Sequence, residues 1–227
     1  MQRILIPLIF GLAGVAVLIW LGVWQMERLT WKQGVLAEIE TRIADAPVEL
    51  PASTDPEADK YLPVRATGQF DEGALRVLVS QKQIGAGYRV ISPVQIGARR
   101  ILVDRGFIKV DQPIPDAPAG NVDITGNLHW PDDRNESTPQ NDVAGNTWFA
   151  RDLDQMAGVL QTEPVLLVLR EMSQPDGSLT PLPVDSGGIP NDHLTYAITW
   201  FSLAVVWLVM TSYYIYRSRK PAKGAQT

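Results

Sequence analysis

The stretch "ILIPLIFGLAGVAVLIWLGVW", Ile4–Trp24, contains no charged side chain, and neither does "LTYAITWFSLAVVWLVMTSYYIY", Leu194–Tyr216. A helix of about 20 apolar residues is long enough to cross the roughly 30 Å hydrocarbon layer of a membrane. The two runs therefore predict a membrane α-helical hairpin, with transmembrane helices at 4–24 and 194–216 and a polar segment between them.

The first run has a competing interpretation as a cleaved signal peptide, because Arg3 precedes it and small residues such as Ala13 and Ala16 lie within it. Its apolar run continues well past those residues, beyond the usual 7–15 residues of a signal core, and no small-residue cleavage site follows. We therefore favour a retained membrane anchor.

The charged residues are distributed unevenly along the chain. All 25 acidic residues lie between Glu27 and Asp192, whereas the tail at 217–227 is basic. Short flanks rich in Lys and Arg stay on the cytoplasmic side of a membrane. We therefore expect both termini in the cytoplasm and the main domain outside, in a periplasm or its organellar equivalent, with the lipid bilayer as a permanent partner.

The composition of the outer segment excludes several classes of function. It combines those 25 acidic residues with 15 of the 20 basic ones, and this negative surface argues against nucleic acid as a partner. The chain has no cysteine. Disulfide bridges, thiolate metal sites and cysteine nucleophiles are therefore excluded, and a copper carrier is a poor interpretation.

The outer segment predicts a single mainly-β (α+β) domain at 47–190. The first helix is expected to extend to about residue 46, because apolar residues recur at helical spacing as far as Ile43 and Pro47 follows. A loop is expected at 48–60, and one short helix near Asp152, an acceptable N-cap. Short β-branched or alternating runs separated by turn residues predict an antiparallel sheet or small barrel. These runs are 61–70, 74–82, 88–96, 100–110, 122–130 and the apolar, buried 163–173.

The familiar catalytic motifs are absent from the sequence. There is no G-x-S-x-G elbow, no phosphate-binding G-x-x-x-x-G-K-[ST] loop and no G-x-G-x-x-G fingerprint. The adjacent carboxylates Asp132 and Asp133 are interpreted as a solvated loop, and His129 as a surface residue. Nothing in the sequence argues for catalysis.

His193 is the candidate binding residue because it opens the second apolar run. Haem requires one axial imidazole beside apolar surface, and a helix N-terminus favours the neutral imidazole that can ligate iron. Asp192 has the opposite effect, and either Asp192 or Asn191 is placed to cap the helix or orient the ring.

A second set of residues lies on the same predicted helix face as His193. Ala197 and Trp200 follow it at helical spacing, and Tyr196 flanks them. The first apolar run offers small residues, among them Gly11 and Gly14, which either let the helices approach closely or leave a slot. Plain helix packing, with His193 as an interfacial hydrogen bonder, is the alternative that the residues alone favour.

Six segments in order resemble the Surfeit-locus family of cytochrome c oxidase assembly factors. They are "LGVWQMERLTWK", "VRATGQFD", "GAGYRVISPV", "ILVDRGFIKV", "STPQNDVAGNTWFARDL" and "PNDHLTYAITWFSLA". Phe107 and Asp192 depart from the family pattern, in which Trp and Asn are common at these positions. Each string is weak alone, but their order between two apolar runs is specific.

The resemblance implies a non-catalytic factor of the bacterial inner membrane. It implies that the chain binds haem a transiently and assists its insertion into the largest subunit of the haem-copper oxidase, cytochrome c oxidase subunit I. It further implies His193 as the axial ligand of the haem iron, with Tyr196, Ala197 and Trp200 beside the cofactor, and haem a synthase as a further partner.

Two other hypotheses remain from the sequence. One is a haem-free scaffold that stabilises the nascent oxidase subunit, and the other is a membrane-tethered enzyme. The resemblance also marks Arg105 and Gly106: Gly106 is expected to be required by its backbone, and Arg105 is expected to be structural, with contact to a haem propionate as the alternative.

Overall fold

The computed structural model describes residues 2–81 and 84–219. These residues form two compact units, one of residues 2–38 with 187–219 and the other of residues 39–186. The elements, in chain order, are α1 (Gln2–Ala44), β1 (Val48–Glu49), β2 (Pro63–Phe70), β3 (Leu75–Gln81), β4 (Gly85–Ile96), β5 (Arg99–Lys109), β6 (Asn121–His129), α2 (Leu153–Leu160), β7 (Leu166–Met172) and α3 (His193–Arg219).

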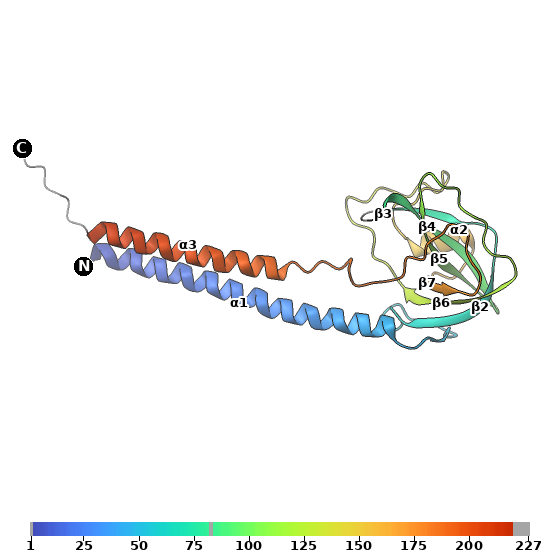
Figure 1. Cartoon of the computed structure of the whole chain (residues 1–227), viewed down its shortest axis with the longest axis horizontal. Helices are drawn as coiled ribbons and strands as arrows, with labels where there is room; N and C mark the ends of the chain where they lie inside the picture. The colour runs from blue at the N-terminus through green and yellow to red at the C-terminus, as the bar shows by residue number, and fades with distance from the viewer. Residues whose placement is uncertain (1, 82–83, 220–227) are drawn as a thin grey trace, which may run out of the picture. The chain divides into compact units, whose positions relative to one another are not determined.

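The helical unit consists of α3 and most of α1, which lie side by side (Figure 1). Gly11 of α1 faces Thr211, Gly14 faces Trp207, and Gly22 faces Phe201, so the two helices run antiparallel. A Cβ atom at any of these glycines would lie under 3.0 Å from the facing side chain. The glycines therefore permit close approach, and the side chains of Thr211, Trp207 and Phe201 occupy the space that a slot would need.

Both helices are long and apolar enough to cross a membrane. The most apolar 18 residues have a mean hydropathy of 2.7 in the segment Ile4–Ala44 and of 1.7 in the segment His193–Arg219. The two apolar helices predicted from the sequence are therefore present, and they flank the sheet domain in the chain.

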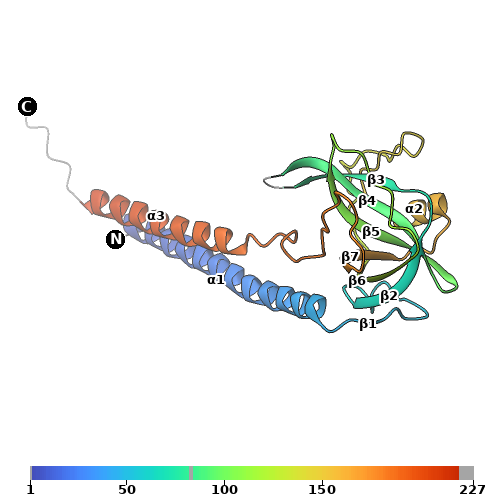
Figure 2. The same ribbon diagram turned by 45° about the vertical axis from the view of Figure 1, so that its right-hand side comes forward.

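The second unit contains one seven-stranded sheet with the strand order β1-β2-β6-β7-β5-β4-β3. The predicted antiparallel arrangement is wrong in two places, because β1 pairs in parallel with β2 and β5 pairs in parallel with β7. The short β1 lies inside the segment predicted as a loop. Two further residue pairs join β2 to β4, and we describe the whole as a mixed sheet. Figure 2 shows β7 between β5 and β6.

The hydrophobic core of the sheet domain lies on both faces of its central strands. Ile101 of β5 and Leu167 of β7 belong to a cluster formed with β2, β4 and β6. Their neighbours Leu102 and Leu166 point the other way, into a cluster with α2. This alternation follows from the period of two along a strand, and it explains why the sequence of β7 reads as a continuous apolar run. Asp152 caps α2 as predicted, its side chain accepting from the Gln155 N–H.

A bulge in β5 decides where Arg105 points. Val90 of β4 pairs with Gly106 and Ile91 pairs with Asp104, so Arg105 is the extra residue between them. Gly106 has a φ of +119°, and a Cβ there would strike the backbone of Thr180. Only glycine fits this position. The expectation that its backbone requires Gly106 is confirmed.

Candidate functional site

His193 is the first residue of α3, and its ring contacts α1. The Nδ1 atom of His193 lies 2.8 Å from the Oε1 atom of Gln25. Gln25 directly follows the apolar run of α1 and is buried, with 9% of its surface exposed. Because the two helices are antiparallel, the residue that follows the apolar run of α1 lies beside the residue that precedes the apolar run of α3.

The hydrogen bond assigns the two ring nitrogens of His193 different roles. A glutamine carbonyl oxygen only accepts, so Nδ1 carries the proton and donates it. In a neutral imidazole Nε2 then holds the free lone pair, which is the state that a metal ligand needs. Among the described residues, none forms a hydrogen bond with Nε2. An imidazole with its lone pair free on Nε2 fits the axial coordination of a haem iron.

Two residues before α3 were expected to cap the helix or orient the ring. The backbone carbonyl of Asp192 accepts from the Tyr196 N–H at 3.2 Å, which starts the helical hydrogen bonds. The Oδ1 atom of Asn191 is buried without a hydrogen-bond partner among the described residues. The hydrogen bond to the ring comes from Gln25, which sequence reasoning missed. The signal was available, since Gln25 is the first polar residue after an apolar run.

The other predicted cofactor residues occupy the first turns of α3. Ala197 is 1% exposed, Tyr196 is 55% exposed, and Trp200 is half-buried. The helix face that starts at His193 thus combines the exposed Tyr196, the half-buried Trp200 and the small, buried Ala197.

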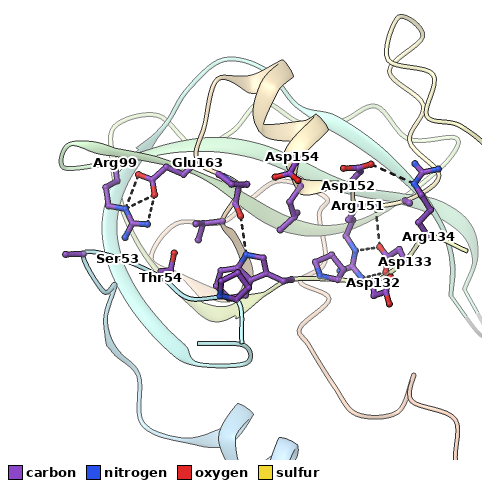
Figure 3. A pocket seen from close by; sticks show the side chains of 18 residues that line it. Ser53, Thr54, Arg99, Asp132, Asp133, Arg134, Arg151, Asp152, Asp154 and Glu163 are labelled. Atoms are coloured by element: carbon purple, nitrogen blue, oxygen red, sulfur yellow. Dashed lines mark hydrogen bonds and ion pairs between the residues drawn. The ribbon is translucent and has the colours of Figure 1, made fainter. Parts of the chain in front are cut away.

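The sheet domain contains a separate cavity of about 630 Å³. Its walls come from the loop after β1, the segment after β6, the start of α2 and the residues before β7. Figure 3 shows three arginine–carboxylate pairs around it, Arg99 with Glu163, Arg151 with Asp133, and Arg134 with Asp152. The cavity walls therefore combine charged and apolar side chains, and all three guanidinium groups are already paired.

Asp132 and Asp133 are both exposed, as the sequence predicted, but Asp133 also forms an ion pair that the sequence did not predict. Asp133 accepts from the Arg151 side chain through both of its oxygens, at 2.6 and 2.9 Å. Burial opposes ionisation of this carboxyl, but the bonds from Arg151 outweigh it and lower the pKa of Asp133. Asp133 thus ties the segment after β6 to the start of α2.

His129 is not the surface residue that the sequence predicted. It ends β6, it is half-buried, and its ring lies 5.5 Å from that of Tyr61. Burial, together with the positive charges of Arg151 and Lys60, lowers the pKa of His129 to about 4. Its Nδ1 atom is buried and has no hydrogen-bond partner among the described residues. The ring is therefore neutral near pH 7.

Arg105 is almost completely buried and paired within the sheet domain. It donates to Asp176 from Nε at 2.8 Å and again from Nη2, and it also donates to the carbonyl of Pro115 at 3.1 Å. Its guanidinium group lies over the ring of Phe70. These contacts give Arg105 a structural role and leave its charge neutralised by Asp176.

No group of three or more histidine, aspartate or glutamate side chains suited to a metal ion occurs within residues 2–81 and 84–219. A single imidazole beside apolar helices suits a metal that brings most of its own ligands, as haem iron does. Of the two described sites, only the His193 site offers this arrangement.

Comparison with known proteins identifies the family. The model of the SURF1 family matches residues 12–205. The chain belongs to the SURF1 family. Among related proteins, Surfeit locus protein 1 of Xenopus tropicalis is 30% identical, over 81% of this chain and 67% of that protein. The human Surfeit locus protein 1 is also 30% identical, over 81% and 69%. The SURF1-like protein of Drosophila melanogaster is 30% identical, over 87% and 72%.

This SURF1-family membership confirms the resemblance seen in the sequence. The matched range includes Gly14 and Gly22 of α1, the whole sheet domain and the first turns of α3. Both residues of the His193–Gln25 hydrogen bond lie within it.

Proposed function

We propose that this chain is a membrane-anchored assembly factor for haem-copper cytochrome c oxidase. It binds haem a transiently through His193 and assists its insertion into subunit I, the largest oxidase subunit, with haem a synthase as the source of the cofactor. The role is non-catalytic. Membership of the SURF1 family supports the assembly role, and the free Nε2 atom of His193 is the observation that supports haem binding.

The residues around His193 support a flat, apolar ligand. Haem supplies an iron that accepts one imidazole nitrogen and a large apolar ring. Gln25 leaves Nε2 of His193 available for that iron. Tyr196 and Trp200, which are exposed and half-buried, offer aromatic surface near the imidazole on the same helix.

The surface of the two helices supports a membrane location. Only 6% of the most apolar 18 residues in the segment Ile4–Ala44 are buried, and only 11% of the most apolar 18 residues in His193–Arg219 are buried. The core helix of a soluble protein is mostly buried, so these side chains need another apolar environment. At 1.5 Å per residue, α3 is about 40 Å long and α1 about 64 Å, so each exceeds a hydrocarbon layer of about 30 Å.

The charge distribution sets the proposed orientation. The basic tail lies in the cytoplasm with both termini, and the acidic sheet domain lies in the periplasm of a bacterial inner membrane. In this orientation, His193 and Gln25 lie near the outer surface of the bilayer. Haem would therefore be held and released at the periplasmic side.

The deciding experiment is a pyridine haemochrome analysis of full-length protein purified from cells that co-express a haem a synthase. Wild type is expected to carry stoichiometric haem a and His193→Ala to lose it, because no other described histidine lies in the helical unit. His129→Ala is the matched control, since it removes the other histidine of the chain and is expected to keep the cofactor.

Two results would contradict the proposal. Colourless wild-type protein, or a His193→Ala variant with undiminished haem, would refute haem binding at this residue. If oxidase yield then still depended on changes in the sheet domain, the haem-free scaffold would replace the carrier. Circular dichroism of the variants checks that loss of haem is not loss of the fold.

A further inference from the structure

The hydrogen bond between Gln25 and His193 connects two residues that are 168 positions apart in the sequence. Gln25 is buried, although it is polar. Glutamine is rarely buried, because its desolvation costs free energy unless a hydrogen bond compensates for it. Its carbonyl oxygen faces one particular ring nitrogen, Nδ1. The contact therefore does more than satisfy a polar group, because it distinguishes the two nitrogens of the ring.

A neutral imidazole carries one proton, and its two tautomers differ in which nitrogen can bind a metal. An acceptor beside Nδ1 stabilises the tautomer with the proton on Nδ1. It also limits rotation of the ring about its side-chain bonds. Both effects present the same lone pair, that of Nε2, in one direction.

The two residues that precede His193 in the chain do not supply this hydrogen bond. The backbone carbonyl of Asp192 accepts from Tyr196. The Oδ1 atom of Asn191 has no partner among the described residues. Gln25 is also neutral, so it orients the ring without burying a negative charge at the edge of an apolar region, where an ionised group is costly.

We propose that Gln25 is the positioning residue of the haem site: its side-chain carbonyl holds neutral His193 with the proton on Nδ1 and directs Nε2 toward the haem iron. This inference rests on the proposed function for its ligand. The hydrogen bond itself exists in the free protein and is testable without haem. Residues that orient a metal-ligating histidine in this way change metal affinity by about 10- to 100-fold when they are replaced.

The first test reads the tautomer in the haem-free, full-length protein in detergent micelles. The chain has two histidines, so ¹⁵N-histidine labelling yields two imidazoles, and His193→Ala assigns them. At a pH where the ring is neutral, wild type is expected to show a protonated Nδ1 and an unprotonated Nε2. Gln25→Leu removes the acceptor at similar volume and is expected to give a mixture of tautomers. Gln25→Glu keeps an acceptor at the same reach and is expected to restore the wild-type pattern.

The second test measures haem affinity of the same variants by titration in detergent. Gln25→Leu is expected to weaken binding by about 10- to 100-fold, and Gln25→Glu to recover most of it. Gln33→Leu is the matched control, because Gln33 is exposed on the same helix and is expected to leave both readouts unchanged. Circular dichroism and thermal melting verify that each variant retains its helices.

The outcomes separate this inference from the proposed function. A wild-type ring with its proton on Nε2, or an identical tautomer in Gln25→Leu, would overturn the positioning role. Unchanged haem affinity in Gln25→Leu would overturn it as well. Wild-type protein that shows the Nδ1 proton but takes up no haem would refute haem binding and leave the orientation of His193 by Gln25 established.

Discussion

The buried ion pair of Arg105 and Asp176 gives a quantitative test of what stabilises the sheet domain. The two side chains are 2% and 7% exposed. Replacing Asp176 with alanine would leave a guanidinium group inside the domain with only the carbonyl of Pro115 and the hydroxyl of Ser92 as polar partners. Removing one partner of a buried pair costs about 3–5 kcal/mol, because the remaining charge is buried and uncompensated.

An exposed ion pair on the same sheet provides the comparison. Arg65 and Glu49 are 63% and 76% exposed, and an exposed pair contributes about 0.2–1 kcal/mol. We therefore expect Asp176→Ala to lower the free energy of unfolding several-fold more than Glu49→Ala. Since a domain is stable by about 5–15 kcal/mol in total, the first change removes a large fraction of the stability.

The assay is native-state hydrogen exchange of the full-length protein, followed by mass spectrometry of peptides from β5 and β7. Exchange in these central strands reports opening of the sheet domain without requiring the helices to unfold. A loss of about 3–5 kcal/mol corresponds to faster exchange by about two to four orders of magnitude. Equal effects of Asp176→Ala and Glu49→Ala would refute the reasoning. The apolar pair Arg105→Met with Asp176→Leu is expected to restore much of the protection.

Three other predictions concern His129, the helix pair and the orientation in the membrane. Burial lowers the pKa of His129 from 6.5 to about 4, so on acidification this histidine takes up a proton in the unfolded chain before it does so in the folded protein. The free energy of unfolding is therefore expected to fall by up to about 3 kcal/mol as the pH drops from 6.5 to 4. Urea unfolding at several pH values should show that His129→Gln lacks this component, and an identical pH profile in the variant would contradict it. Gly14→Leu is expected to destabilise the helix pair by about 1–3 kcal/mol, because the new side chain overlaps α3. A Cβ at Gly34 meets nothing within 4 Å, so Gly34→Leu is expected to leave the melting temperature unchanged. Equal melting temperatures of the two variants would refute close packing. Since the chain has no cysteine, Ser137→Cys and Ser218→Cys each provide one thiol, and a membrane-impermeant maleimide applied to spheroplasts should label only the first; labelling of the second before lysis would reverse the proposed orientation.

The local structure of the sheet domain was predictable because short-range rules dominate it. Alternating β-branched residues located β2 to β6, and the continuous apolar run at Leu166 located β7 as a buried strand. Asp152 was recognisable as an N-cap because its side chain needs only the backbone of the following turn. Such signals lie within a few residues of the feature that they specify.

Features that depend on distant partners were not predictable. The parallel pairing of β5 with β7 depends on which strands meet after folding, and local alternation carries no information about it. The bonds of Asp133 to Arg151, and the burial that lowers the pKa of His129, arise from loops packed together in space. In the candidate site, helical spacing identified His193 and its face, but the antiparallel contact was needed to find Gln25.

The position of β7 in the sheet has a consequence for the synthesis of the protein. β7 is the last strand among the described residues, yet it lies between β5 and β6 and pairs with both. Until residues 166–172 leave the ribosome and reach their compartment, β5 and β6 each have an unpaired edge, which favours aggregation and degradation. The sheet is therefore completed only when nearly the whole domain is available, and a chain terminated before Leu166 would retain most of its strands and still lack the one that joins them.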